Sequence, residues 1–112
     1  MTQQEKQLLL KDLCARMPYG VNVRNVKMGF DIYDFNHNVK EIKTLIEEYG
    51  ISPYLRPMSS MTDEDCNIFD SLAREPMQIE LFEWLNSHHL DYRGLIEKGL
   101  ALEAPEGMYK IK

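Results

Sequence analysis

Long hydrophobic runs are absent from this sequence, and no stretch approaches the ~18 apolar residues that a membrane-spanning helix needs. The polar N-terminus, residues 1–6, lacks the apolar segment of a secretory signal. Glycine-rich phosphate loops of the GxGxxG or GxxxxGK[ST] type are also missing, so the common sequence signatures of nucleotide binding are excluded. These absences favour a cytoplasmic protein that makes no membrane contact.

Cysteine is scarce, since Cys14 and Cys66 are the only two and they form no CxxC motif. Each lies among apolar neighbours on a predicted helix, which predicts two buried, reduced thiols. A disulfide or a redox pair is the alternative interpretation.

The composition is that of one globular domain. Of the 112 residues, 44% are hydrophobic and 28% are charged, which are ordinary values. The net charge of −5 is unevenly distributed, because residues 1–57 sum to +1 and residues 58–112 sum to −6. Since affinity for nucleic acid depends on positive charge that faces the phosphates, this distribution argues against a nucleic-acid partner.

The first fifty residues predict two helices around a β-hairpin. Thr2 with Glu5, and Asn38 with Glu41, have the spacing of a capping box at a helix start, and Gly50 is typical of a helix end. Between the two helices, apolar residues alternate with polar ones, as they do in strands. The predicted elements are helices over 2–16 and 39–49 and strands over 21–27 and 30–35, which turn at Met28-Gly29.

An extended connector, residues 51–62, occupies the middle of the chain and is predicted to be neither helix nor strand. Pro53 and Pro57 fix their own φ angles and bias the residues before them toward extended geometry. Thr62, followed by three acids, then predicts the start of a third helix. We expect the connector to dock onto the body of the domain, with Leu55 mostly buried.

The remaining residues predict three helices and a C-terminal hairpin. Cys66 and Ile68 are expected on the inward face of the first of these helices, and the second is expected to be central because its apolar residues cover more than one face. Those apolar residues are Ile79, Leu81, Phe82, Trp84 and Leu85. The predicted elements are helices over 63–74, 77–88 and 91–98, and strands over 100–103 and 108–111 that turn at 104–107.

The fold class is therefore α+β. We expect a helix-rich single domain, residues 1–112, with a small N-terminal β-hairpin and a short C-terminal hairpin. Residues 1–50 form the helix-hairpin-helix part, residues 51–62 the connector, and residues 63–112 the helical part.

Two polar groups near the end of the fourth helix are candidates for chemistry. His88 and His89, with Asp91, could hold a metal, but adjacent helical residues point about 100° apart and zinc prefers three or four such ligands. The alternative is a helix end at which imidazoles meet free carbonyls. The string Asp91-Tyr92-Arg93-Gly94 is interpreted as a helix cap.

The connector holds a third candidate. Ser59 and Ser60 lie close in sequence to Tyr54 and Arg56, a combination that could hold a phosphate or supply a nucleophile. A nucleophile needs a positioned base, and no histidine has a recognisable spacing to these serines. An extended linker that leads into a helix is the alternative.

Four stretches carry a resemblance to a known family. They are residues 8–20, residues 53–62 (PYLRPMSSMT), residues 84–86 with 91–96 (WLN and DYRGLI), and residues 98–101 with 105–109. These stretches resemble segments of small uncharacterised proteins of gut Bacteroidales and their phages or mobile elements. The resemblance covers most of the chain and implies a cytoplasmic protein; it implies no activity, and no functional residue transfers.

Three functional hypotheses follow. The first is a non-enzymatic protein-binding or adaptor protein, with no cofactor and no catalytic or metal-binding residue. The second is a nucleic-acid-associated accessory factor, and the third is an enzyme or metal protein built on His88, His89, Asp91 or Ser59. A helix-turn-helix with a wing, with residues 92–98 as its recognition helix, is a related alternative.

The candidate partner surface of the first hypothesis comprises Tyr54, Leu55, Arg56, Met58, Ser59 and Ser60. The candidate phosphate contacts of the second are Arg24, Lys27, Lys40 and Lys43.

Overall fold

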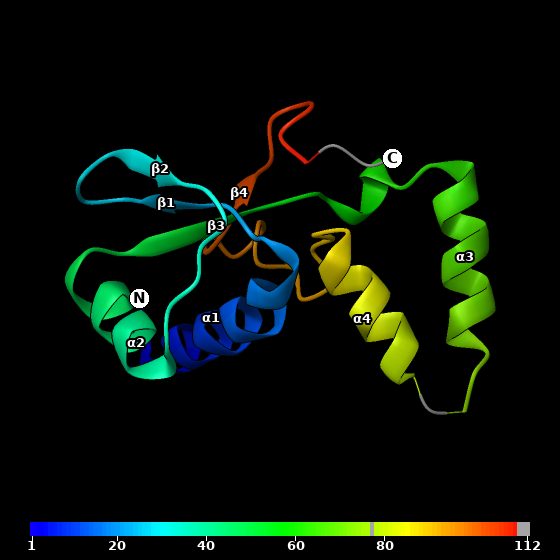
Figure 1. The fold of residues 1–112 in the computed structure, drawn as a ribbon, viewed down its shortest axis with the longest axis horizontal. Helices are drawn as coiled ribbons and strands as arrows, with labels where there is room; N and C mark the ends of the chain where they lie inside the picture. The colour runs from blue at the N-terminus through cyan, green and yellow to red at the C-terminus, as the bar shows by residue number, and fades with distance from the viewer. Residues whose placement is uncertain (77, 110–112) are drawn as a thin grey trace.

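A mixed four-stranded sheet organises the chain in the computed structural model, which describes residues 1–76 and 78–109 (Figure 1). The strand order is β2-β1-β3-β4, so two hairpin strands, a central strand and a C-terminal strand lie side by side. The α+β class is confirmed. The elements are α1 (Gln3–Arg16), η1 (Met17–Tyr19), β1 (Val23–Asn25), β2 (Phe30–Ile32), α2 (Val39–Glu48), β3 (Ile51–Leu55), η2 (Met58–Ser60), α3 (Asp63–Ala73), α4 (Ile79–Ser87) and β4 (Leu102–Glu103).

The helix starts follow the capping residues of the sequence. At α1 the Glu5 N–H donates to the Thr2 hydroxyl at 3.1 Å, and the Thr2 N–H donates back to the Glu5 carboxylate at 2.8 Å. The same reciprocal pair joins Asn38 to Glu41 at α2, and Thr62 begins α3 in the same way. These caps satisfy backbone N–H groups that have no partner inside the helix.

The predicted hairpin is present, but its strands are shorter than expected. The β1 and β2 strands pair antiparallel over three residues each, with Arg24 opposite Asp31. Residues 26–29 form the turn, in which Gly29 adopts a φ of +74° and donates its N–H to the Asn25 carbonyl at 2.8 Å. The left-handed conformation of residue 29 favours glycine. Because the turn already begins at residue 26, the strands are shorter than the alternation of apolar and polar residues predicted.

Part of the predicted connector is a strand, and the expectation that residues 51–62 contain none is wrong. The β3 strand lies between β1 and β4, and Pro53 lies opposite Val23. Proline is tolerated there because hydrogen-bonded pairs alternate along an antiparallel ladder. The Tyr54 N–H donates at 2.8 Å to the carbonyl of Asn22, the residue before β1, so the nitrogen of residue 53 faces the other side. On that side, pairing with β4 begins only at Tyr54.

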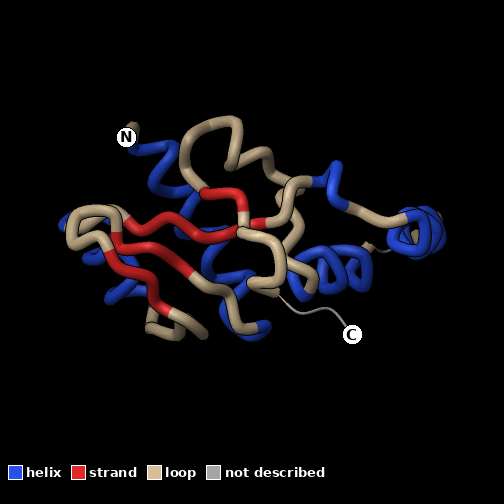
Figure 2. The backbone as a smooth tube through the Cα atoms, turned by 90° about the horizontal axis from the view of Figure 1, so that it is seen from above, coloured by secondary structure: helices blue, strands red, loops and turns tan. Residues whose placement is uncertain are grey.

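The main core lies between the sheet and the first two helices. Figures 1 and 2 show α1 and α2 beneath one face of the sheet, with the β1–β2 hairpin at one end of the molecule. The buried residues come from both helices, the strands and the loops that follow them. They are Leu9, Leu13, Val21, Val23, Phe35, Ile42, Ile46 and Ile51.

The helices α3 and α4 lie at the opposite end of the molecule (Figure 1), and their burial differs from expectation. Leu81 and Leu85 are buried, but Ile79 and Phe82 are 57% and 45% exposed, so α4 presents one apolar face to the core rather than several. Trp84 packs half-buried against the same cluster.

Both cysteine expectations also need correction. Cys66 on α3 is exposed, whereas Cys14 on α1 is half-buried, and both thiols are free. Ile68, expected to face inward with Cys66, is exposed as well. The apolar residues of α3 that pack against the core cluster are Phe69, Leu72 and Ala73, so the contact is confined to the second half of the helix.

The predicted fifth helix over 91–98 does not form. The Asp91 carboxylate accepts hydrogen bonds from the Leu95 N–H at 2.8 Å and the Ile96 N–H at 3.0 Å, so a side chain takes the place of helical carbonyls. Gly94 adopts a φ of +70°, which no α-helix contains. The segment is a series of turns instead.

The C-terminal hairpin is also a wrong prediction. The β4 strand pairs parallel with β3, Tyr54 opposite Leu102, instead of with a returning strand. The predicted turn is present, because the Met108 N–H bonds to the Pro105 carbonyl at 3.1 Å, but residues 108–109 form no strand. The rest of the predicted return, residues 110–111, lies outside the described residues.

A buried ion pair joins α1 to the C-terminal turns. Asp12 and Arg16 are both fully buried and lie 2.9 Å apart (Oδ2 to Nε). The second carboxylate oxygen of Asp12 accepts from Arg93 at 2.8 Å, and Arg16 donates to the Leu90 carbonyl at 2.7 Å. The sequence spacing of Asp12 and Arg16 is the i, i+4 pattern of an exposed pair, so their burial was not expected.

Candidate functional site

The predicted partner surface on the connector is only partly exposed. Tyr54 is 8% exposed and Leu55 is fully buried, so neither offers a partner much contact area. Arg56 is half-buried and pairs with Asp65 at 3.4 Å (Nη2 to Oδ2). Of the six predicted residues, Ser59 and Ser60 are exposed and Met58 is half-buried.

The predicted histidine group is divided among different partners. The Nδ1 of His88 lies 3.0 Å from the Trp84 carbonyl, and the His88 ring packs 4.7 Å from the Trp84 ring. Asp91 is occupied by backbone N–H groups, as described above. Within residues 1–76 and 78–109, no three His, Cys, Asp or Glu side chains are placed to share a metal ion.

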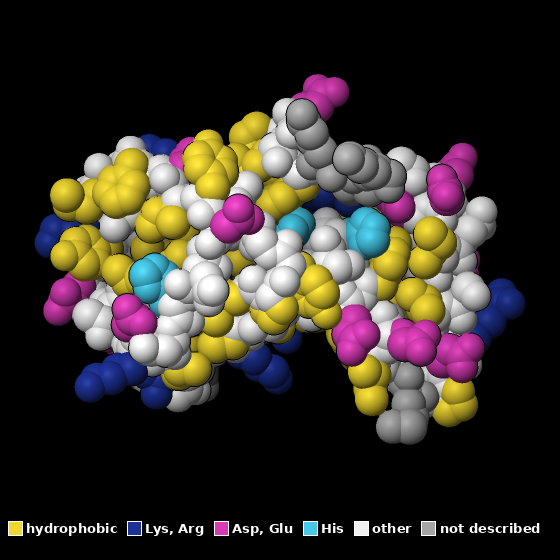
Figure 3. All heavy atoms as spheres, in the orientation of Figure 1, with side chains coloured by type: hydrophobic (Ala, Val, Ile, Leu, Met, Phe, Trp, Pro, Cys, Tyr) yellow, Lys and Arg dark blue, Asp and Glu magenta, His cyan; other side chains and the backbone are white. Residues whose placement is uncertain are grey.

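His89 lies instead in a cleft between the end of β2 and the end of α4. The cleft has a volume of about 390 Å³, within the range of small-ligand pockets. Figure 3 shows histidine side chains on this face of the molecule, one of them recessed near its centre. The lining residues are Tyr19, Gly20, Asn22, Tyr33, Asp34, Ser87, His88, His89, Met108 and Tyr109.

Three residues of this cleft have left-handed backbone conformations. Gly20, Asp34 and His89 have φ angles of +75°, +52° and +56°, and the latter two are the non-glycine residues with positive φ in the described chain. A β-carbon on residue 20 would lie 2.8 Å from the Asp34 Oδ1. Left-handed non-glycine residues persist only where the surrounding structure holds them, and they concentrate at binding sites.

The electrostatics of His89 follow from its burial. Its ring stacks on Tyr109 at a centroid distance of 3.9 Å, and its Nδ1 has no hydrogen-bond partner among the described residues. Burial lowers the pKa of His89 to about 4, and the positive charge of Arg16 acts in the same direction. The imidazole is therefore neutral at physiological pH.

Tyr109 fastens the C-terminal segment over the sheet. Its hydroxyl donates to the Tyr54 carbonyl at 2.7 Å and accepts from the Asn22 N–H at 2.9 Å. Burial raises the pKa of Tyr109 to about 12, so the hydroxyl stays protonated. Because these bonds span three segments, Tyr109 positions the wall of the cleft that stacks on His89.

Exposed apolar side chains surround the β1–β2 hairpin. Val26, Met28, Phe30 and Tyr33 are 56%, 61%, 48% and 64% exposed. Figure 3 shows apolar side chains gathered over this end of the molecule, which Figure 1 identifies as the hairpin. We call these four residues the hairpin surface. Exposed apolar side chains that gather in one region mark interaction sites in soluble proteins.

The predicted phosphate contacts belong to two elements, the hairpin and α2. Arg24 pairs with Asp31 at 3.1 Å, and the same Asp31 oxygen accepts from the Tyr54 hydroxyl at 2.6 Å. The Lys27 ammonium lies 5.9 Å from the centre of the Tyr49 ring. Lys40 and Lys43 belong to α2 and are exposed. The four cations are thus shared between the hairpin and a helix.

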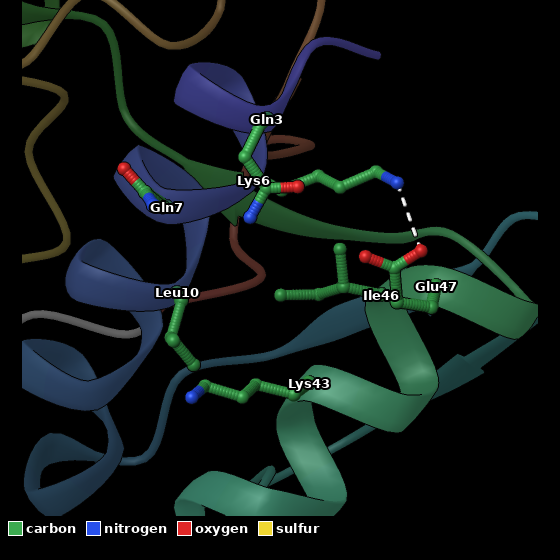
Figure 4. Close-up of a pocket in the computed structure, with 7 residues that line it drawn as sticks. All are labelled: Gln3, Lys6, Gln7, Leu10, Lys43, Ile46 and Glu47. Carbon is green, nitrogen blue, oxygen red and sulfur yellow. Dashed lines mark hydrogen bonds and ion pairs between the residues drawn. The ribbon is translucent and has the colours of Figure 1, made fainter.

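A second cleft lies between α1 and α2 (Figure 4). Its floor includes Leu10 and Ile46, and the Lys6 ammonium lies 2.8 Å from the Glu47 carboxylate across one end. In Figure 4 the Lys43 side chain extends toward Leu10 and away from that ion pair. The cleft of about 350 Å³ is largely apolar, and its one ion pair links the two helices.

Comparison with known proteins gives no relative for this fold or site. No family model, no curated protein and no solved structure matches this chain. No helix in the described part of the chain is long and apolar enough to cross a bilayer.

Sequence reasoning missed the assembly of the His89 cleft. The sequence predicts Tyr33 within the strand over residues 30–35. Tyr109 was assigned to a hairpin. The sequence does place several turn residues next to tyrosines. It does not indicate which turns come together, because that depends on contacts between distant parts of the chain.

Proposed function

We propose that this chain is a non-enzymatic protein-binding or adaptor protein of the cytoplasm, and that it contacts its partner through the hairpin surface. The observation that supports this proposal is the exposure of four large apolar side chains around one short hairpin. Removing such side chains from water on binding is favourable by about 25 cal/mol per Å² of apolar area. The resemblance to mobile-element proteins of gut Bacteroidales supports a cytoplasmic setting.

The position of the hairpin supports the same role. The β2 strand is at the edge of the sheet, and it is only three residues long. Short edge strands limit indiscriminate pairing with other chains, so side chains rather than an open backbone edge provide the contact area. Met28 lies in the turn and Phe30 begins β2, so both can be changed without opening the main core.

The test compares two double variants of the full chain. The first, Met28→Ser with Phe30→Ser, removes apolar area from the hairpin surface. The second, Ile79→Ser with Phe82→Ser, removes comparable exposed area from α4 and serves as the matched control. Proteins retained by the wild-type chain from bacterial extract are purified, and their affinity for each variant is measured.

The expected result is a loss of at least about tenfold in affinity for the hairpin variant, equivalent to about 1.4 kcal/mol, and little change for the α4 variant. Both variants should keep the wild-type unfolding midpoint, since the altered residues are exposed. Equal binding by the hairpin variant and the wild type would reject this surface as the contact.

A further inference from the structure

We propose that the His89 cleft binds an organic cation, an alkylammonium or guanidinium group, between the Asp34 carboxylate and the side chains of Tyr19 and Tyr33. This site is separate from the protein contact proposed for the hairpin, although Tyr33 belongs to both. The group could come from a free small molecule or from a Lys or Arg side chain of a partner. The volume of about 390 Å³ accommodates either.

The charge of the cleft supports a positive ligand. Asp34 is the only acid that lines it, and no lysine or arginine lines it within the described residues. Asp34 takes part in none of the ion pairs of residues 1–76 and 78–109. An exposed carboxylate without an internal cation can pair with one from outside.

The positive groups behind the cleft are already compensated. Arg16, the nearby cation that lowers the pKa of His89, is paired with Asp12 at 2.9 Å. Arg56 acts on His89 more weakly and pairs with Asp65. Because each of these arginines is paired with an aspartate, the two repel an incoming cation only weakly.

The aromatic residues supply the rest of the recognition. Tyr19 and Tyr33 are 38% and 64% exposed where they line the cleft, and tyrosine rings attract ammonium and guanidinium groups through their negative faces. His89 is neutral at physiological pH, so it adds no positive charge to this wall of the cleft.

The backbone holds the carboxylate in position. The Asp34 N–H donates to the Asn22 side chain at 3.1 Å, which fixes the left-handed residue. The Asp34 Oδ1 lies 2.8 Å from the position that a β-carbon of residue 20 would occupy, so Gly20 makes room for this carboxylate. A carboxylate placed in this way loses little conformational freedom on binding, which favours affinity.

The test is a titration of the full chain, observed by two-dimensional ¹H–¹⁵N NMR, with butylguanidinium as the probe and neutral butylurea as its isostere. We expect shifts at Gly20, Asp34 and His89 with butylguanidinium, with a dissociation constant in the millimolar range, and at least tenfold weaker binding of butylurea. Equal binding of the two compounds, or no shift at these residues up to ~50 mM butylguanidinium, would overturn the proposal.

Two variants test the assigned residues. Asp34→Asn removes the charge but keeps a residue that tolerates the left-handed conformation, and it should weaken binding about tenfold. Tyr33→Leu keeps the charge and should weaken binding about threefold. Glu103→Gln, which removes an exposed acid outside the cleft, should bind like the wild type. Unchanged binding by Asp34→Asn would overturn the assignment, and Tyr33→Leu decides the question if Asp34→Asn fails to fold.

The peptide Ac-Gly-Arg-Gly-amide distinguishes the two sources of the cation. If this peptide binds at the same residues, the cleft accepts an arginine side chain of a partner. If butylguanidinium binds and the peptide does not, the cleft accepts a free small molecule. The proposal for the hairpin surface is unaffected by either result, because its test uses residues outside the cleft.

Discussion

Asp12 and Arg16 form an ion pair in which neither side chain has any exposed surface, with 2.9 Å between Oδ2 and Nε. Arg93 provides a second cation to the same carboxylate at 2.8 Å. We predict that Asp12→Asn lowers the free energy of unfolding by about 3–5 kcal/mol, because it leaves the buried Arg16 charge uncompensated. Urea denaturation measures the change.

The matched control for that variant is Glu47→Gln. Glu47 pairs with Lys6 at 2.8 Å, but its side chain is 55% exposed, and exposed pairs contribute little. A change within about 1 kcal/mol is expected. If the two variants lose the same stability, the buried Asp12 carboxylate contributes no more to stability than an exposed one.

The pKa of His89 predicts how stability depends on pH. The pKa is lowered from 6.5 to about 4, so the unfolded chain binds this proton more readily than the folded chain does. Neutral His89 makes its full contribution to the free energy of unfolding above pH ~6.5. This contribution falls by roughly 3 kcal/mol in all as the pH decreases toward 4. The measurement is urea denaturation between pH 4 and pH 7.

Acidic residues also titrate near the lower limit of this range, so the comparison is made with His89→Asn, which tolerates the positive φ. As the pH falls from 6.5, the wild type should lose stability faster than the variant. The difference between their free energies of unfolding should therefore narrow, or reverse in favour of the variant. Parallel curves would show that folding does not shift the pKa of His89.

Gly20 and Gly94 allow the backbone effect of a glycine-to-alanine substitution to be separated from its steric effect. Both have positive φ, but a β-carbon on residue 20 would meet the Asp34 Oδ1 at 2.8 Å, whereas one on residue 94 meets no atom within 4 Å. Gly94→Ala should cost about 1 kcal/mol for the backbone alone, and Gly20→Ala should cost more. Thermal unfolding of both variants provides the comparison, and equal losses would mean that Asp34 moves aside freely.

Leu55 and Leu102 test the burial of the central strand. Leu55 is fully buried in β3, and Leu102 on the neighbouring β4 is 37% exposed. Leu55→Ala should lower the free energy of unfolding by about 2–5 kcal/mol, and Leu102→Ala should lower it by less than about 1 kcal/mol. The urea midpoints give both values. A wild-type midpoint for Leu55→Ala would contradict the docked position of β3.

Local signals in the sequence predicted the elements that depend on local contacts. The caps at Thr2, Asn38 and Thr62 act within four residues of chain, so the starts of α1, α2 and α3 were predicted correctly. The docking of Leu55 was also anticipated. These predictions are confirmed because capping residues and apolar side chains are visible in the sequence.

The errors concern partners that are distant in sequence. The strand character of β3 depends on β1 and β4, and Pro53 conceals it because proline usually marks a connector. The fifth helix failed because Asp91 bonds forward to the backbone of residues 95 and 96. The same limitation hid the cleft, since His89 and Tyr109 meet only after the C-terminal segment crosses the sheet.

The order in which the strands are synthesised has a consequence for how the chain reaches this fold. The β3 strand obtains its first neighbour from residues made earlier, but its second neighbour, β4, is made almost fifty residues later. Arg93 likewise reaches Asp12 across 81 positions of chain. A nascent chain that has released only its first ninety residues therefore exposes an unpaired sheet edge and an acid without its second cation. Such intermediates aggregate readily, so we expect molecular chaperones to raise the yield of this protein during synthesis.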